Sequence, residues 1–148
     1  MSENSVSFEV KADLAELERL REIICSFGRD HDLPDKIVFV LNLVLDELIT
    51  NSIKYGHLEA GNHLISVRIA YAPEAVTIEV EDDGCPFNPL TATRPDIHCP
   101  IEERGIGGLG LHLVRSLMDE MDYERFKDKN IVRIRKKLIE SGSAACNR

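Results

Sequence analysis

Five stretches of the chain are predicted to be strands: residues 5–10, 64–71, 75–80, 121–126 and 131–134. The first three alternate apolar and polar residues, the pattern of a strand that buries one face. The turn Ala72-Pro73-Glu74 separates the second stretch from the third, so these two are expected to form an antiparallel hairpin. The last two stretches are expected to close the sheet around a turn at Asp128-Lys129-Asn130.

Three other stretches repeat apolar residues every three or four positions, as amphipathic helices do. They span residues 13–27, 34–58 and 109–118. Asp13 can cap the first helix. Gly28 to Leu33 is expected to break the chain before the second helix, and Pro34 suits the first turn of that helix. The apolar stripe of the first helix is expected to comprise Leu14, Leu17, Leu20, Ile23, Ile24 and Phe27.

The order of these elements predicts an α+β fold. Helices follow one another and strands come mostly in hairpins, which favours a two-layer sandwich with a mainly antiparallel sheet and helices on one face. The order does not alternate strand and helix, which argues against a dinucleotide-binding or P-loop fold. With 148 residues the chain is expected to be one domain over residues 1–140, followed by a flexible tail at 141–148.

Composition narrows the classes of function. Charged residues make up 30% of the chain and hydrophobic residues 43%, as in ordinary soluble domains. A net charge of −8 argues against direct binding to nucleic acid or to an anionic membrane. No apolar run approaches the ~20 residues of a membrane span, and the first residues lack a secretion-signal pattern. The four cysteines show no Cys-x-x-Cys spacing, so we expect reduced thiols and a cytoplasmic protein.

The second helix carries a polar pair. Glu47 and Asn51 are four residues apart, which places a carboxylate above an amide on one helix face. One interpretation is a solvated edge of an ordinary helix, because most charged residues are exposed. The other is a polar site completed by residues from later in the chain.

A carboxylate at the end of a strand is the second candidate. Asp82-Asp83-Gly84 follows Ile78-Glu79-Val80. A strand-end carboxylate beside a glycine turn can accept the exocyclic amine of adenine. Asp and Gly are also the expected residues of a plain turn.

A glycine-rich segment is the third candidate. Residues 104–111 read Arg-Gly-Ile-Gly-Gly-Leu-Gly-Leu and lead into the third helix. Glycine lets the backbone come close to a ligand, and the free N–H groups of a first helical turn attract phosphate. A hinge without a ligand would have the same composition. The segment lacks the Gly-Lys-Ser/Thr ending of a Walker loop.

The three segments in this order resemble the Bergerat-fold (GHKL, HATPase_c) ATP-binding family. They read Glu-x-x-x-Asn on a helix, Asp-x-Gly-x-x-Phe after a hairpin, and Gly-x-Gly-Gly-x-Gly-Leu opening a helix. The segments Glu-Leu-Ile-Thr-Asn-Ser-Ile-Lys-Tyr and Asp-Asp-Gly-Cys-Pro-Phe-Asn-Pro look most like the stand-alone anti-sigma factor serine/threonine kinases. The resemblance covers residues 8–138.

The resemblance implies a role for each matching residue. Asn51 would ligate Mg²⁺ between the phosphates of ATP, and Glu47 would be the general base. Asp82 would bind the adenine amine, and Gly84 would let the ring approach. Residues 90–104 would form a lid over the phosphates. The resemblance further assigns phosphate contacts to Arg104, Gly105, Gly107, Gly108 and Gly110. Phosphoryl transfer needs in-line positioning and a hard cation on oxygen ligands, and these residue types suit both.

The resemblance also implies a function. The chain is expected to be an ATP-dependent serine/threonine protein kinase and anti-sigma factor that phosphorylates an anti-anti-sigma (STAS) protein, so its partners would include a sigma factor. A homodimer is expected, with the first strand as a plausible edge. No phosphoacceptor histidine segment or transducer domain is evident, which argues against a histidine kinase, a topoisomerase or a mismatch-repair protein. The alternatives are an ATP-controlled binding module without kinase activity and a nucleotide-free domain that kept the fold.

Overall fold

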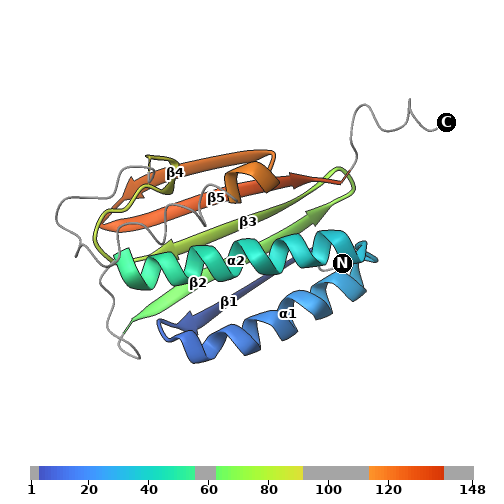
Figure 1. The fold of residues 1–148 in the computed structure, drawn as a ribbon, viewed down its shortest axis with the longest axis horizontal. Coiled ribbons are helices and arrows are strands. Elements are labelled where there is room, and N and C mark those ends of the chain that lie inside the picture. The colour runs from blue at the N-terminus through green and yellow to red at the C-terminus, as the bar shows by residue number, and fades with distance from the viewer. Residues whose placement is uncertain (1–3, 56–62, 92–113, 139–148) are drawn as a thin grey trace.

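Figure 1 shows the computed structural model of the chain, which describes residues 4–55, 63–91 and 114–138. The strands are β1 (Ser5–Lys11), β2 (Leu64–Ala72), β3 (Ala75–Asp82), β4 (Glu120–Phe126) and β5 (Lys129–Lys137). The helices are α1 (Leu17–Asp30) and α2 (Asp35–Tyr55), with short 3-10 turns at η1 (Leu14–Glu16) and η2 (Pro89–Thr91). Residues 114–117 are also helical.

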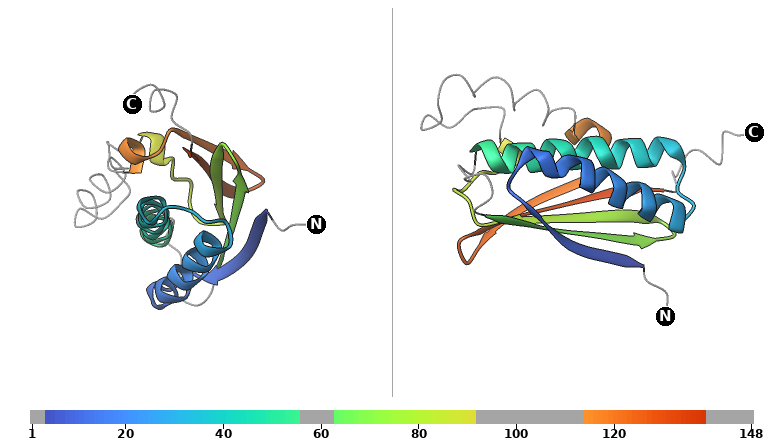
Figure 2. Two further views of the ribbon diagram at one scale, coloured as in Figure 1. Left: turned by 90° about the vertical axis from the view of Figure 1, so that its right-hand side faces the viewer. Right: turned by 90° about the horizontal axis from the view of Figure 1, so that it is seen from below.

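The strands form one five-stranded sheet in the order β1-β2-β3-β5-β4, and every neighbouring pair is antiparallel. Figure 2 shows α1, α2 and the helical residues 114–117 on the same face of this sheet. The predicted two-layer α+β architecture is therefore confirmed. Both predicted hairpins are present, as β2–β3 and β4–β5.

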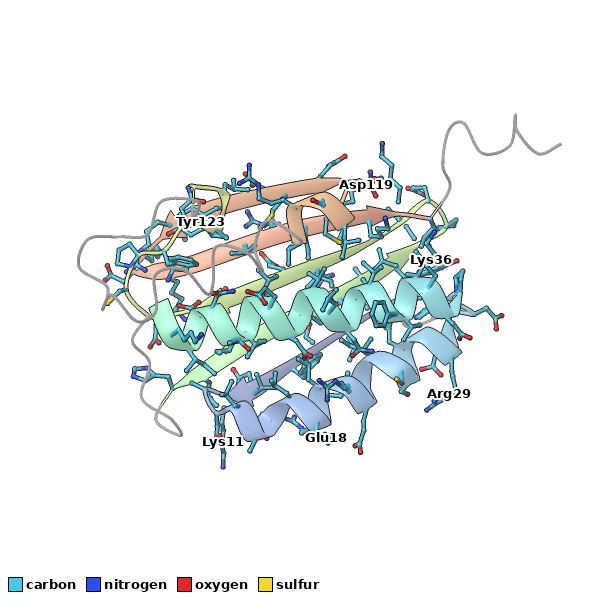
Figure 3. All side chains as sticks on the ribbon, in the orientation of Figure 1. Lys11, Glu18, Arg29, Lys36, Asp119 and Tyr123 are labelled. Carbon is cyan, nitrogen blue, oxygen red and sulfur yellow. The ribbon has the colours of Figure 1, made fainter. Side chains whose placement is uncertain are left out.

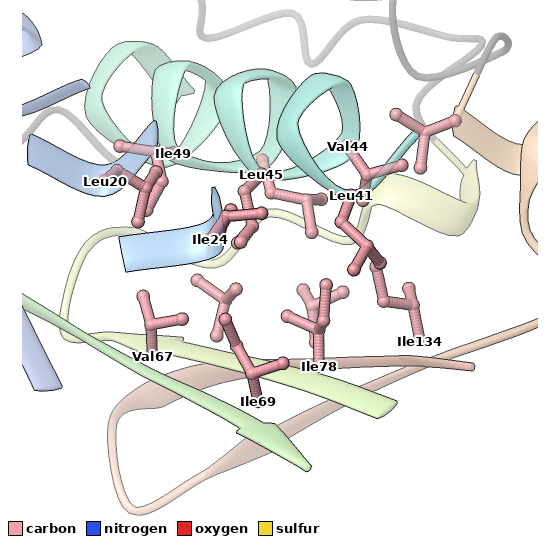
Figure 4. Close-up of a cluster of buried hydrophobic side chains, with 14 of the residues drawn as sticks. Leu20, Ile24, Leu41, Val44, Leu45, Ile49, Val67, Ile69, Ile78 and Ile134 are labelled. Carbon is pink, nitrogen blue, oxygen red and sulfur yellow. The ribbon is translucent and has the colours of Figure 1, made fainter. Parts of the chain in front are cut away.

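The core fills the space between the sheet and the two long helices. Leu20 and Ile24 of α1 and Leu41 and Leu45 of α2 are fully buried against the inward side chains of the sheet (Figure 4). The inward side chains of β2 and β3 are those the alternation predicted: Ile65, Val67, Ile69, Val76, Ile78 and Val80. This apolar layer holds α2 at a fixed height above β3, which decides where the polar residues at the end of α2 lie.

The first helix differs from its prediction at both ends. Leu14 was expected in the apolar stripe but is 54% exposed, because it lies in the 3-10 turn that Asp13 caps and is out of phase with the α-helix that begins at Leu17. Gly28 was expected to begin the break, yet α1 continues to Asp30. A Cβ at Gly28 would lie 2.6 Å from Val38 Cγ2, so glycine is needed there for close packing of α1 on α2.

The second helix begins as predicted. The Pro34 carbonyl accepts hydrogen bonds from the backbone N–H groups of Ile37 (2.9 Å) and Val38 (3.1 Å). The helix is described to Tyr55, and the remaining predicted residues, to Leu58, lie outside the described part of the chain. Within the residues that the structure describes, no helix combines the length and apolar character needed to cross a bilayer.

The turn of the final hairpin begins one residue earlier than expected and is shorter. Lys127 and Asp128 have φ values of 52° and 65°, as a two-residue turn of type I′ requires, and β5 begins at Lys129. The predicted turn at Asp128-Lys129-Asn130 is wrong in this respect. Asn130 is consequently a strand residue with a buried side chain.

Candidate functional site

The polar pair on α2 is in direct contact. The Asn51 Nδ2 atom donates hydrogen bonds to the Glu47 carbonyl oxygen at 2.7 Å and to Glu47 Oε2 at 2.6 Å. Asn51 is only 3% exposed, whereas Glu47 is half-buried. The interpretation of this pair as a solvated helix edge is therefore wrong for Asn51. Because the amide nitrogen is engaged twice by Glu47, the Asn51 Oδ1 atom is the one left to face another group.

Asp82 ends β3 on the inner face of the sheet and is 5% exposed. Its Oδ1 atom accepts hydrogen bonds from the backbone N–H of Gly84 at 2.8 Å and from Asn130 Nδ2 at 3.0 Å. The bond to Gly84 closes a turn two residues long, which holds the carboxylate against its own loop. Asp82 is thus held at the end of the strand, and its predicted contact with adenine stays a prediction.

Asn130 is a functional candidate that the sequence reasoning missed. Its Nδ2 atom donates to Asp82 Oδ1 and to the carbonyl oxygen of Cys85 at 2.8 Å, while its Oδ1 atom accepts from the backbone N–H of Phe87 at 3.2 Å. The buried Asn130 amide hydrogen-bonds to several points of the loop that runs from Asp82 to Phe87. These bonds fix the loop relative to β5. An asparagine close to an aspartate and a lysine between two strands is typical of a turn, so no signal in the chain pointed to this role.

Two residues of β4 support this arrangement from the other side. The Tyr123 hydroxyl donates to Asn130 Oδ1 at 2.6 Å, and Arg125 Nη1 donates to the Gly84 carbonyl oxygen at 2.8 Å. Burial raises the pKa of Tyr123 above its ordinary value of 10.0, with the nearby Arg125 charge acting in the opposite direction. Tyr123 therefore remains a protonated donor at neutral pH. Figure 3 shows Tyr123 at the end of the molecule where α2 ends.

Asn51 and Asp82 line the same small cavity, although they are far apart in the chain. The cavity has a volume of about 20 Å³. Its walls combine polar groups with an apolar lining: Leu48, Asn51, Ser52, Val80, Asp82, Phe87, Pro89, Asn130 and Val132. Three of these side chains can accept or donate hydrogen bonds while being almost fully buried: Asn51, Asp82 and Asn130. A cavity of this volume has room for about one water molecule, so it shows where polar groups from separate segments converge and not the full extent of a ligand site.

The remaining predicted site residues cannot be placed. Arg104, Gly105, Gly107, Gly108 and Gly110 lie outside the described residues, as does most of the predicted lid. The structure therefore brings Asn51 and Asp82, from two of the three predicted segments, to one cavity, and it adds Asn130. Glu47 is hydrogen-bonded to Asn51, and the Gly84 N–H to Asp82.

Comparison with known proteins agrees with this geometry. The sequence matches the histidine kinase-like ATPase domain family over residues 10–136, so the chain belongs to that family. The predicted resemblance to the Bergerat-fold ATPases is thereby confirmed, and membership of an ATPase family implies ATP binding.

Individual relatives are distant in sequence. The serine/threonine-protein kinase BtrW of Bordetella bronchiseptica is 24% identical over 90 residues, which cover 61% of this chain and 63% of that protein. The anti-sigma F factor of Geobacillus kaustophilus is 25% identical over 107 residues, covering 72% of this chain and 73% of the relative. The anti-sigma F factor of Clostridium acetobutylicum is 27% identical over 150 residues, covering 95% and 99% respectively. The chain is thus similar to one relative named as a serine/threonine-protein kinase and to others named as anti-sigma F factors.

Proposed function

We propose that this chain is an ATP-dependent serine/threonine protein kinase that also acts as an anti-sigma factor. Its substrate would be a serine of a small anti-anti-sigma (STAS) protein, and phosphorylation would determine which partner the kinase holds. The names of its relatives support the kinase and anti-sigma assignments. The observation that carries the proposal is the Glu47–Asn51 hydrogen bond beside a cavity that also contains Asp82.

In this proposal the adenine ring binds against Asp82, and the cavity of about 20 Å³ widens to receive it. The Asp82 carboxylate accepts the exocyclic amine of the base, and the absence of a side chain at Gly84 lets the ring approach the loop. The hydrogen bonds from Asn130 and the Gly84 N–H hold Asp82 in place, so little freedom is lost when the base binds. Arg104 and the glycines at 105, 107, 108 and 110 would contact the phosphates.

The residues at the end of α2 fit a magnesium site that is completed by the nucleotide. Among the described residues no group of three His, Cys, Asp or Glu side chains could hold a metal by itself. Mg²⁺ bound with ATP needs few protein ligands, because phosphate and water oxygens supply the others. Since the Asn51 Nδ2 atom is hydrogen-bonded to Glu47, the Asn51 Oδ1 atom is available as a neutral oxygen ligand. The ion would neutralise charge on the phosphate oxygens.

Glu47 is the proposed general base. Its carboxylate would take the proton from the serine hydroxyl as the hydroxyl oxygen attacks the γ-phosphorus and the bond to ADP breaks. The Asn51 amide, 2.6 Å from Oε2, restricts how the carboxylate can rotate. Positioning of this kind contributes more to phosphoryl transfer than the basicity of the group, because the transition state needs little covalent assistance.

The test combines ATP binding with phosphate transfer. The purified protein would be mixed with radiolabelled ATP, Mg²⁺ and a STAS protein encoded beside it, and calorimetry would report nucleotide binding. Glu47→Gln should reduce transfer by about 10²-fold or more while preserving ATP binding. Asn51→Ala should abolish both. Asn42→Ala, on α2 but outside the cavity, is the matched control and should retain both activities.

Two results would contradict the kinase assignment in different ways. If the wild-type protein binds ATP and the STAS protein but transfers no phosphate, the chain is an ATP-controlled binding module. In that case Asn51→Ala should still abolish partner binding, and Glu47→Gln should leave it unchanged. If calorimetry detects no ATP binding at all, the nucleotide site itself is refuted.

A further inference from the structure

The strand β1 has a free backbone edge. It is the outermost strand of the sheet, so one side of its backbone has no neighbouring strand. The Asn4 carbonyl oxygen accepts a hydrogen bond from the Tyr71 N–H, and the backbone groups that face the neighbour in an antiparallel pair alternate along the strand. The N–H and C=O groups of Ser5, Ser7 and Glu9 therefore point towards the free edge.

This edge is protected in its second half only. Arg19 Nη1 donates to the Glu9 carbonyl oxygen at 3.1 Å, and the Lys11 N–H donates to Glu16 Oε1 at 3.0 Å. No described residue forms such a bond with the outward backbone groups of residues 5–7. Natural proteins usually cover or block a free edge, because it can pair with another chain. The first half of β1 is thus a place where an extended segment can add a strand.

A groove lies beside this open half, between β1 and α1, with a volume of about 270 Å³. Its lining combines apolar and polar side chains: Val6, Glu22, Ile23, Ser26, Phe27 and Asp30. Val6 and Ile23 are half-buried and Phe27 is buried, so the floor of the groove is apolar. Figure 2 shows β1 at the margin of the sheet and α1 on the helical side of that margin. A strand added to β1 would therefore point alternate side chains towards the groove.

The wall of the groove that α1 supplies is acidic. Glu22, Ser26 and Asp30 are exposed and follow one another at intervals of four residues, so they lie in a row along the helix. Neither Glu22 nor Asp30 forms an ion pair with a described residue. Among the described residues, no lysine or arginine lines the groove. Two unpaired carboxylates beside a free strand edge favour a positively charged partner.

We propose that an extended, basic segment of another protein binds in this groove as an additional strand beside β1. Glu22 and Asp30 are eight residues apart, which separates them by about 12 Å along the helix. Side chains four residues apart in a strand share one face and are separated by about 13 Å. A segment with basic residues four positions apart and an apolar residue midway between them therefore meets Glu22, the apolar floor and Asp30 together.

Backbone and side chains divide the work of recognition in this proposal. The outward N–H and C=O groups of Ser5 and Ser7 bond to the backbone of the segment and do not depend on its sequence. The groove selects the side chains, because its floor accepts an apolar group and its wall accepts positive charge. A free small molecule would leave the backbone groups of β1 unpaired.

The groove is separate from the proposed nucleotide site. Asp30 ends α1, close to the start of α2 at Asp35, whereas Asn51 lies in the last turns of α2. Figure 3 shows Arg29, next to Asp30, and Tyr123, beside the Asp82 loop, at opposite ends of the molecule. The proposal therefore goes beyond the kinase function, and failure of ATP binding would leave it untouched.

Fluorescence anisotropy with a labelled peptide, Thr-Lys-Thr-Ile-Thr-Lys-Thr, tests the proposal. In an extended conformation its lysines and isoleucine share one face. The peptide should bind saturably below about 1 mM, and binding should weaken as salt is added. A peptide of the same composition in another order, Thr-Lys-Lys-Thr-Ile-Thr-Thr, should bind about tenfold more weakly, because it cannot place both lysines and the isoleucine correctly.

Charge reversal on α1 tests the acidic wall. Glu22→Lys and Asp30→Lys should each weaken binding of the lysine peptide about tenfold, and the double variant should instead bind Thr-Glu-Thr-Ile-Thr-Glu-Thr. The matched control is Glu18→Lys, because Glu18 is 81% exposed on the same helix and does not line the groove. Ser7→Pro removes an N–H that β2 does not use, so it should weaken binding without unfolding the chain. Circular dichroism would confirm that each variant is folded.

N-methylated peptides distinguish strand addition from simple charge attraction. Methyl groups on the backbone nitrogens of the lysines and isoleucine block one side of the extended peptide, and those on the threonines between them block the other. One of these two peptides should lose binding and the other should keep it, and equal effects would overturn the proposal. So would a reordered peptide that binds as well as the first, or binding that Glu22→Lys and Asp30→Lys do not weaken. Sedimentation that shows the peptide separating two copies of the chain would also overturn it, because a second copy would then occupy the edge.

Discussion

The Asn51 amide nitrogen lies 2.6 Å from Glu47 Oε2, one turn back along α2. The contact links the two residues that the proposed mechanism uses for different purposes. It aims the Asn51 Oδ1 atom away from Glu47, and it limits rotation of the Glu47 carboxylate. Asn51 is 3% exposed, so no water can readily replace the carboxylate as its partner. The orientation of the amide and the position of the proposed base are therefore coupled.

Replacing this amide by a second carboxylate should be strongly unfavourable. In Asn51→Asp the donor is lost and two negative charges face each other in a nearly buried place, which should lower the free energy of unfolding by about 2–4 kcal/mol at about pH 8. Asn51→Leu has a similar size and no charge. The difference in the free energy of unfolding between Asn51→Asp and Asn51→Leu should shrink towards about pH 5, because protonation of one carboxylate relieves the repulsion.

Urea denaturation of both variants at the two pH values measures this difference. If the difference in stability between Asn51→Asp and Asn51→Leu does not depend on pH, repulsion between the two carboxylates is not its cause. Equal stability of Asn51→Asp and the wild-type chain would show that the Glu47–Asn51 contact is not maintained in solution.

The loop that carries Asp82 should depend on Asn130. Asn130→Ala would leave Asp82 Oδ1, the Phe87 N–H and the Tyr123 hydroxyl each short of a partner. Losing several buried hydrogen bonds at one position should cost about 2–4 kcal/mol of stability. Asn130→Asp keeps an acceptor for Phe87 and Tyr123 but replaces the donor to Asp82 by a negative charge. We therefore expect it to weaken ATP binding more than Asn130→Ala does.

Thermal denaturation and calorimetry with ATP separate the two effects. If both variants lose stability but bind ATP with wild-type affinity, Asn130 supports the fold and has no part in holding Asp82 for the base. Asn88 lies on the same loop, beyond Phe87 in the chain. Asn88→Ala shows how ATP binding responds when the loop is loosened but Asn130 is kept.

The packing of α1 on α2 gives a third prediction. In a helix, Gly→Ala usually raises stability through propensity, yet an added Cβ at Gly28 would lie 2.6 Å from Val38 Cγ2. The overlap should dominate and lower stability by about 1–3 kcal/mol. The double variant Gly28→Ala/Val38→Ala removes the overlapping methyl groups and should be more stable than Gly28→Ala alone. Chemical denaturation of the three proteins checks this order, and a stabilised Gly28→Ala would show that the helices can separate without cost.

The hydrophobic pattern predicts the structure correctly where one physical rule dominates. Strict alternation in β2 and β3 reflects a sheet with one buried face, so the predicted inward residues, from Ile65 to Val80, are the buried ones. The Glu47–Asn51 contact follows from helix geometry alone, because residues four apart lie on one face.

The sequence pattern predicts the wrong local structure where tertiary contacts override local preference. Gly28 looks like a helix terminator, but it stays within α1 because Val38 of the next helix needs the space. Asn130 looks like a turn residue, but the turn is made by Lys127 and Asp128 and the asparagine is drawn into the sheet. Its partners Asp82 and Tyr123 come from two other strands, and no local pattern could identify them.

Tyr123 provides a test of the same loop through pH. Its hydroxyl donates to Asn130 Oδ1 at 2.6 Å, so Tyr123→Phe should cost about 1 kcal/mol at neutral pH. Burial raises the pKa of Tyr123 in the folded chain above the ordinary value of 10.0. A group whose pKa is raised by folding stabilises the folded state below its unfolded pKa, and this contribution is lost as the pH rises through the folded pKa.

The stability difference between the wild-type chain and Tyr123→Phe should therefore be constant below pH 10.0 and should shrink above it. Lysine side chains titrate in the same range, but they are common to both proteins and cancel in the difference. Urea denaturation at several alkaline pH values measures this difference, and tyrosine absorbance reports the ionisation directly. A difference that grows with pH would have the opposite sign to this prediction, because it would mean that folding stabilises the ionised phenol, as a dominant influence of Arg125 would do.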